Sequence, residues 1–267
     1  MFSDLNRPPL NAVELRRGLD YYSHLDVVER TGSTNADLLA RADEPDADRA
    51  VLIAEFQESG RGRHSRTWVS PPQATITLSV LLRLPAIEPQ DLGWLPLLTG
   101  VAVVDALRSV AKVDALLKWP NDVQIDGKKV AGILAEVGKT APEPVVVIGV
   151  GLNVSLREDE LPVPEATSLL LANAEITDRT TLVRALLREL ASRLTAWERA
   201  GWATGDLAAA YRERCSTIGA DVRADLPGGD AITGTAIGVD EHGRLTIDVG
   251  DESRSVAAGD VTHLRPV

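Results

Sequence analysis

The sequence predicts an α+β fold in two parts, a larger domain over residues 1–214 and a small β-barrel over residues 215–267. Apolar runs with strand character share the first part with helical stretches, and its longest helix, TLVRALLRELASRLTAWERA, carries one apolar stripe. After Cys215 the chain changes to short strand-like runs separated by turns such as PGGD, DEHG and GDES. At 267 residues the chain can bury a sizeable core in one or two domains.

The first 50 residues predict two helices joined by polar segments. One helix is expected around residues 12–22, and NADLLARA predicts a second that begins at TGSTN, residues 31–35. Ser33 or Thr34 can cap this second helix, or their hydroxyls can hydrogen-bond a polar ligand, and both interpretations stay open. ARADEPDADRA, residues 40–50, is typical of an acidic surface loop.

The strands of the larger domain are predicted by apolar runs. VLIAEF and VVVIGVGLNV indicate buried strands, and ATITLSVLL alternates apolar with hydroxyl residues, which is strand periodicity. KWPNDVQIDGKKVAGILAEV predicts a hairpin, because Asp126 and Gly127 form a turn dipeptide between two apolar-rich runs. The apolar window LGWLPLLTGVAVVDAL is interrupted by Pro96 and Asp105 and is too short to span a bilayer, so it predicts a buried helix.

Charge and cysteine content limit the function classes. The formal net charge is −11 and the sequence pI is about 4.9, which argues against a duplex nucleic-acid binder with a wide basic face. Cys215 is the only cysteine, as suits a reducing cytoplasm. The beginning of the chain, MFSDLNRPPL, has no apolar run of the signal-peptide kind. We therefore expect a cytoplasmic protein that binds neither DNA nor membranes.

GRGRHSRTW, residues 60–68, concentrates arginines, glycines and one tryptophan in a short loop. Glycines allow backbone N–H groups to approach an anion, and arginines make bidentate contacts with phosphate or carboxylate groups. The loop lacks the Gly-Lys-Ser/Thr ending of a P-loop. The motif alone is equally compatible with a solvated basic turn.

Two further motifs place polar groups beside strands. KWPNDV, residues 118–123, offers Lys118, Asn121 and Asp122 in one short loop, although a plain turn would also explain Pro-Asn-Asp. GVGLNV, residues 149–154, places Gly149 and Gly151 inside an apolar strand, where glycine often marks close approach by a ligand or another backbone.

The order of these motifs is more specific than any one of them. TGSTNADLL, AEFQESGRGRHSRTW, KWPNDVQIDGKKVAGILAEV and GVGLNV in succession resemble the biotin–protein ligases, also called biotin–[acetyl-CoA-carboxylase] ligases. The resemblance implies a catalytic domain like that of class II aminoacyl-tRNA synthetases, followed by an SH3-like barrel. It implies that biotin and ATP form biotinyl-5′-adenylate, and that the biotinyl group passes to a lysine of a biotin carboxyl-carrier domain. Because TGSTN lies close to the start of the chain, we expect the single-function type without an N-terminal winged helix.

The resemblance also assigns roles to residues at matched positions. Lys129 and Arg63 would be catalytic, and Asp122 would serve Mg²⁺. The biotin-binding set would be Ser33, Thr34, Asn35, Gln57, Arg61, Gly62, Arg63, Lys129 and Gly132. The nucleotide-binding set would be Arg63, Trp68, Lys118, Asn121 and Asn153. His64 and Ser65 stand where the family often has another basic residue and a glycine, so a stiffer loop is expected.

Three alternatives remain at the level of sequence. A lipoate–protein ligase also activates an acid as its adenylate, although KWPNDV and GRGRHSRTW favour biotin. A non-catalytic biotin or nucleotide sensor would need the same cavity without a reactive lysine contact. An RNA-binding module would suit the arginine–glycine loop, but the acidic composition weighs against it. A homodimer is possible.

Overall fold

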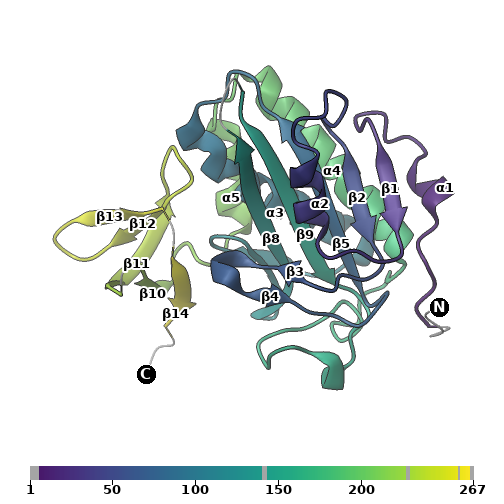
Figure 1. Ribbon diagram of the computed structural model, residues 1–267. Coiled ribbons are helices and arrows are strands. Elements are labelled where there is room, and N and C mark those ends of the chain that lie inside the picture. Colours follow the sequence, from purple (N-terminus) through teal and green to yellow (C-terminus); the bar gives the residue numbers. More distant parts are fainter. Residues whose placement is uncertain (1–5, 140–142, 227–228, 258, 265–267) are drawn as a thin grey trace.

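The computed structural model describes residues 6–139, 143–226, 229–257 and 259–264, and its centre is a mixed seven-stranded sheet (Figure 1). The strand order is β1-β2-β5-β9-β8-β7-β6. β1 pairs with β2 in parallel, and the other neighbours are antiparallel. The strands are β1 (Leu25–Val28), β2 (Val51–Ala54), β5 (Thr75–Arg83), β6 (Ala115–Lys118), β7 (Asp122–Ile125), β8 (Lys128–Lys139) and β9 (Val145–Asn153).

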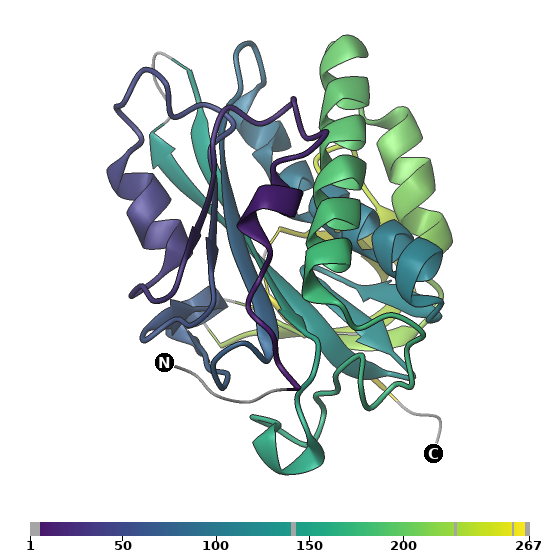
Figure 2. The same cartoon turned by 90° about the vertical axis from the view of Figure 1, so that its right-hand side faces the viewer.

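Helices cover both faces of this sheet. α3 (Trp94–Ala106), α4 (Arg179–Arg199) and α5 (Gly205–Arg214) lie on one face, and α2 (Thr34–Ala40) lies on the other, as both views show (Figures 1 and 2). A large apolar core fills the first interface, and a smaller cluster around Leu38 fills the second. α1 (Ala12–Leu15) is a single turn, and further short turns span Arg63–Ser65, Pro89–Gly93, Leu107–Ala111 and Glu158–Glu160.

The apolar stripe of α4 and the continuous apolar window of α3 predict the burial of these two helices correctly. α4 buries the stripe of Leu182, Leu186, Leu190, Leu194 and Trp197. The stretch Pro89–Ala111 is apolar and long enough to cross a membrane by composition, but 72% of its most apolar window is buried inside the protein. Within the described residues it is therefore a core helix, as the sequence indicates.

The helix expected at residues 12–22 is wrong beyond its first turn. α1 ends at Leu15, and Gly18 has a φ of +66°, which a helix cannot contain. The chain after Gly18 instead packs Leu19 and Tyr22 into the core, and the Tyr22 hydroxyl donates to the carbonyl of Leu187 at 2.7 Å. Tertiary contacts outweigh local helix propensity here.

The predicted hairpin of β7 and β8 is confirmed. Asp126 and Gly127 join the two strands, and both have positive φ, at 51° and 74°, as a two-residue primed turn requires. The strand ATITLSVLL is β5, and its hydroxyl-bearing face is buried as deeply as its apolar face. On that polar face, Thr77 lines a cavity described below, and Ser79 lies behind the cavity wall, where it hydrogen-bonds Thr34 and Asn35.

A second, five-stranded antiparallel sheet follows α5 (Figure 1). Its strands are β10 (Asp221–Asp225), β11 (Ala231–Val239), β12 (Leu245–Asp248), β13 (Ser253–Val256) and β14 (Asp260–His263), in the order β13-β12-β11-β10-β14. The turn between β11 and β12 packs on the larger part, because the indoles of Trp94 and Trp119 donate to the carbonyls of Glu241 and Gly243. The apolar core is continuous across this contact.

Candidate active site

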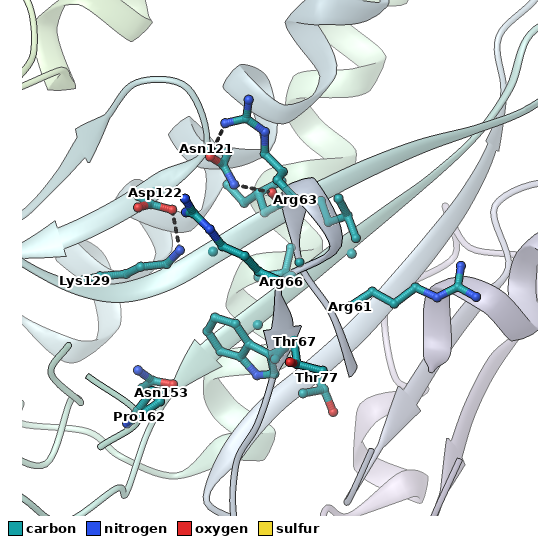
Figure 3. A pocket seen from close by; sticks show the side chains of 18 of the residues that line it. Arg61, Arg63, Arg66, Thr67, Thr77, Asn121, Asp122, Lys129, Asn153 and Pro162 are labelled. Atoms are coloured by element: carbon teal, nitrogen blue, oxygen red, sulfur yellow. Dashed lines mark hydrogen bonds and ion pairs between the residues drawn. The ribbon is translucent and has the colours of Figure 1, made fainter. Parts of the chain in front are cut away.

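A cavity of about 580 Å³ lies on the α2 face of the seven-stranded sheet (Figure 3). Its wall combines the start of α2, the hairpin of β3 (Gly60–Arg61) and β4 (Thr67–Trp68), the β6–β7 turn, β8, β9 and the edge strand β14. Every residue that the family resemblance singles out lines this one cavity: Ser33, Thr34, Asn35, Gln57, Arg61, Gly62, Arg63, Trp68, Lys118, Asn121, Asp122, Lys129, Gly132 and Asn153. A volume of this size is typical of small-molecule sites.

One end of the cavity is a buried polar network around the start of α2. Ser33 caps the helix through a 3.5 Å hydrogen bond from the Ala36 N–H, so the capping interpretation is confirmed, and Ser33 also lines the cavity. Thr34 donates its backbone N–H to the Gln57 side-chain oxygen at 2.8 Å. The Thr34 hydroxyl lies 2.6 Å from that of Ser79, which in turn donates to Asn35 Oδ1 at 2.5 Å.

The glycine–arginine motif forms a short hairpin. β3 pairs with β4, and the Gly62 N–H donates to the Arg66 carbonyl at 2.7 Å across the tip. His64 at the tip has a φ of 51°, in the left-handed region that glycine occupies without strain. Ser65, which stands where the family often has glycine, ends the same short turn, and the expectation of a stiffer loop stays a prediction.

Trp68 reaches from β4 across the centre of the cavity floor. A Cβ on Gly151 would lie 2.5 Å from its indole, and one on Gly132 would lie 3.3 Å from it. The indole N–H is buried and has no hydrogen-bond partner among the residues that the structure describes. Gly149 makes room in the same way for the side-chain oxygen of Asn35. The glycines of GVGLNV thus admit the side chains of Asn35 and Trp68, whereas the sequence predicts close approach by a ligand or another backbone.

Arg63 projects from the hairpin tip toward the β6–β7 turn (Figure 3). Its guanidinium donates to Asn121 Oδ1 at 3.0 Å, and Asn121 donates its own amide to the Ile133 carbonyl at 2.8 Å. Partial burial lowers the pKa of Arg63 from its ordinary value, although the negative charges of Asp260 and Asp122 oppose that effect. A desolvated cation held by a neutral amide keeps most of its charge available to a bound anion.

Lys129 lies at the start of β8 beside Asp122. Its ammonium is 2.6 Å from Asp122 Oδ1, and its backbone is held by Glu165 and Thr167 through hydrogen bonds of 2.7 and 2.8 Å. A Cβ on Gly132 would lie 3.1 Å from the Lys129 ammonium, so glycine leaves room for it. Lys128, its neighbour, is exposed and lies outside the cavity lining.

The remaining expected residues sit at the edges. Asn153 is buried and donates to the Thr167 carbonyl at 2.9 Å, which ties β9 to the segment beside Lys129. Lys118 ends β6, and burial, together with the charge of Lys118, lowers the pKa of His263. Arg61 points away from Lys129 and Asn121 in Figure 3, and its guanidinium is 3.3 Å from Glu136.

Several neighbours of the cavity are absent from the sequence-based set. Asp260, Val261 and Thr262 of β14 line it, Asp260 pairs with Arg66, and the Gly259 carbonyl lies 3.5 Å from Arg63. Ser79 and Glu136 hold Asn35. Arg66 and Glu136 stand in quoted motifs where their charge could have indicated a role. The others reach the site through tertiary folding.

The described residues contain no group of three or more His, Cys, Asp or Glu side chains placed to hold a metal ion. Asp122 is a single carboxylate that already pairs with Lys129. Mg²⁺ keeps several waters and is usually bound by one or two carboxylates together with substrate phosphates. Asp122 therefore fits a magnesium ion that arrives with a nucleotide, but not a metal held by the protein alone.

Two family models match this chain. Residues 27–153 match the biotin/lipoate A/B protein ligase family, and residues 217–264 match the biotin protein ligase C-terminal domain. Among curated relatives, the chain is 48% identical over 270 residues to the biotin–[acetyl-CoA-carboxylase] ligase of Mycobacterium tuberculosis, with 98% of each chain covered. It is 35% identical to the bifunctional ligase/repressor BirA of Escherichia coli, over 90% of this chain and 73% of that one.

A solved structure agrees with these matches. The biotin protein ligase from Aquifex aeolicus in complex with biotin and ATP has a TM-score of 0.76 at 26% identity, covering 92% of this chain and 100% of that one. Fold, cavity and matches define the class, a ligase of the biotin and lipoate type. Within that class the chain belongs to the biotin protein ligase family.

Proposed function

We propose that this chain forms biotinyl-5′-adenylate from biotin and ATP and transfers the biotinyl group to a lysine of the biotin carboxyl-carrier domain of an acetyl-CoA or acyl-CoA carboxylase. In the first step a biotin carboxylate oxygen attacks the α-phosphorus and pyrophosphate leaves. In the second, the carrier amine attacks the acyl carbon and AMP leaves. The observation that carries the proposal is a single cavity that combines a buried polar end with several cations.

The cations of the cavity would offset the repulsion between the carboxylate and the phosphate in the first step. A carboxylate must approach a phosphate, and positive charge placed beforehand offsets their repulsion and stabilises the charge that builds up as they react. Lys129 is oriented by Asp122 and Arg63 by Asn121 in the cavity wall, and we assign these two cations the catalytic roles. Asp122 would also approach Mg²⁺ brought by the nucleotide.

The substrates would divide the cavity between them. We place the biotin ring at the polar end formed by Ser33, Thr34, Asn35 and Gln57, with Arg61, Gly62, Arg63, Lys129 and Gly132 along its chain and carboxylate. The nucleotide would lie along Arg63, Trp68, Lys118, Asn121 and Asn153. The unpartnered indole N–H of Trp68 supports this placement, since a buried donor without a partner costs free energy that a ligand acceptor would recover.

The proposal also covers the architecture of the two domains and the cellular location of the enzyme. We propose that residues 1–214 form a catalytic domain like that of class II aminoacyl-tRNA synthetases and that residues 215–267 form an SH3-like barrel. The mainly antiparallel seven-stranded sheet with helices and the small five-stranded sheet support these assignments. A cytoplasmic enzyme that acts on a carrier protein and binds no DNA fits the acidic composition.

The deciding experiment combines purified protein with biotin, ATP, Mg²⁺ and a biotin-carrier domain. We expect biotin-dependent release of pyrophosphate and a carrier band on a streptavidin blot. Omission of each substrate in turn is the control. Lipoate in place of biotin should release no pyrophosphate, and release of pyrophosphate with lipoate but not with biotin would replace this proposal by a lipoate ligase.

A further inference from the structure

At the polar end of the cavity, side chains form a chain of hydrogen bonds. The Glu136 end of this chain determines which group donates and which accepts in each bond. The chain runs from Glu136 to Asn35, then to Ser79 and Thr34. Ser79 is fully buried in β5, and neither Ser79 nor Glu136 belongs to the cavity lining. Ser79 therefore acts on a ligand through Thr34 and Asn35, which do line it, and Glu136 acts through Asn35 and also contacts Arg61 of the lining.

The direction of the chain begins at Glu136. Its carboxylate accepts from the Asn35 amide nitrogen at 2.8 Å, and the Leu134 carbonyl accepts from the same nitrogen at 3.3 Å. An ionised carboxylate and a carbonyl have no proton to give, so the Asn35 nitrogen must face them. The Asn35 oxygen then faces Ser79, and the Ser79 hydroxyl must donate to it at 2.5 Å.

These bonds determine which hydrogen-bonding role the Thr34 hydroxyl presents to the cavity. Its hydroxyl proton has two protein acceptors, Ser79 Oγ at 2.6 Å and Gln57 Oε1 at 3.0 Å. The Ser79 proton is already used on Asn35, and Gln57 Oε1 already accepts from the Thr34 N–H at 2.8 Å, so neither neighbour supplies a proton to the Thr34 oxygen. Whichever acceptor takes the proton, Thr34 presents only an oxygen lone pair to the cavity.

We infer that Ser79 and Glu136 are positioning residues that set specificity by making Thr34 a hydrogen-bond acceptor for a ring N–H of the substrate. The inference rests on the proposed placement of biotin in this cavity. The cyclic urea of biotin carries N–H donors, whereas the dithiolane ring of lipoate carries none. A site with a fixed buried acceptor rejects a ligand that lacks the matching donor.

The test compares biotin with its two cyclic-carbamate analogues, in which one ring N–H or the other is replaced by oxygen. Binding is measured by titration calorimetry with the wild-type protein and with Ser79→Ala. The wild type should bind one analogue at least about tenfold more weakly than biotin, because the lone pair of the Thr34 oxygen would face a lone pair of the analogue's ring oxygen. In Ser79→Ala the Thr34 hydroxyl can turn and donate to the analogue. We expect the ratio of the affinities for biotin and for that analogue to be at least threefold smaller in Ser79→Ala than in the wild type.

Two further variants make the outcome specific. Ser79→Cys keeps a weak donor and should restore part of the discrimination, and Thr99→Ala removes a buried hydroxyl that donates within α3 to Leu95 and should leave it unchanged. If Ser79→Ala does not fold, Glu136→Gln carries the test, because its amide can offer an N–H to Asn35 and reverse the chain.

The possible results separate the inference from the proposed function. A wild-type protein that does not bind biotin would remove the proposed function. A wild-type protein that binds biotin but does not distinguish it from either analogue would overturn the inference alone. So would a folded Ser79→Ala protein, or in its place Glu136→Gln, that discriminates as the wild type does.

Discussion

Lys128 and Lys129 are adjacent, chemically identical and placed in different surroundings. Lys128 is exposed at the end of the β7–β8 turn, whereas the ammonium of Lys129 lies 2.6 Å from Asp122 inside the cavity wall. An exposed lysine contributes little to stability or activity. A cation held where negative charge develops stabilises the transition state more than the ground state, so Lys129 has the larger role in the proposed reaction.

Replacement of Lys129 by alanine should therefore reduce biotin-dependent pyrophosphate release by about 10²–10³-fold. The melting temperature should change little, because the side chain is one-third exposed at 34%. Lys128→Ala is the matched control and should keep near wild-type activity. Equal activity in two folded variants would remove Lys129 from the mechanism.

Gly151 offers a second test at the scale of a residue. A methyl group there would lie 2.5 Å from the Trp68 indole, whereas nothing lies within 4 Å of a Cβ built on Gly238. We expect Gly151→Ala to displace Trp68 and weaken ATP binding about tenfold, while Gly238→Ala binds ATP normally. Calorimetric titration with ATP measures the difference. Unchanged ATP affinity in Gly151→Ala would show that Trp68 is not part of the nucleotide site.

In the proposed reaction, the β3–β4 hairpin is the element that would cover the reacting groups. Arg63 at its tip is fixed by Asn121 and approaches the Gly259 carbonyl, and Arg66 pairs with Asp260 of β14. These contacts join the hairpin to the β6–β7 turn and to the second sheet. A hairpin held at three points can retain an intermediate more effectively than a free loop.

Arg63→Gly should loosen this hairpin and release the adenylate before transfer. A charge-assisted hydrogen bond to phosphate contributes about 1.5–3 kcal/mol, and the variant would have glycine at three of the four positions 60–63. Adenylate formation should persist in part, and the released intermediate should acylate bystander lysines. Biotinylation of added serum albumin is the measurement. Background labelling of albumin with continued labelling of the carrier would show that the hairpin does not retain the intermediate.

Element by element, the sequence predicts local features better than distant ones. The β7–β8 hairpin follows from Asp126-Gly127, and the burial of α4 follows from its apolar stripe. The extended helix at 12–22 fails because Gly18 turns the chain toward the core. The contacts of Asp260 and Glu136 with the arginines of the hairpin depend on residues far apart in the chain, and no local pattern encodes them.

At the scale of the whole molecule, charge is distributed unevenly. The chain carries a formal net charge of −11, yet Arg61, Arg63, Arg66, Lys118 and Lys129 line a single cavity. This concentration favours small anionic ligands, whereas the overall charge repels a polyanionic duplex. A gel shift with the operator of a biotin-synthesis gene, with biotin and ATP present, should show no specific complex even at low salt. A discrete band that resists competitor DNA would contradict this prediction.

The junction between the two sheets should make stability depend on pH through His263. The backbone N–H of Trp119 donates to the Thr217 hydroxyl, which lies 3.0 Å from His263 Nε2 on β14. The Thr217 hydroxyl can give its proton to the nitrogen of a neutral imidazole but not to an imidazolium, which has no free lone pair. Burial, and then the charge of Lys118, lower the pKa of His263 below its ordinary value. The unfolded chain therefore takes up this proton at a higher pH than the folded protein does.

Well above pH 6.5, His263 is neutral in both states and does not change the free energy of unfolding. As the pH falls below about 6.5, protonation of the unfolded chain lowers the free energy of unfolding. The decrease ends at the lower pH where His263 of the folded protein is protonated as well. His263→Gln can still accept the Thr217 proton but cannot titrate. We expect the melting temperature of the wild type to fall more between pH 7.5 and pH 5 than that of His263→Gln. His24→Gln, a surface histidine before β1, should follow the wild type. Parallel curves for the wild type and His263→Gln would show that this junction does not sense protons.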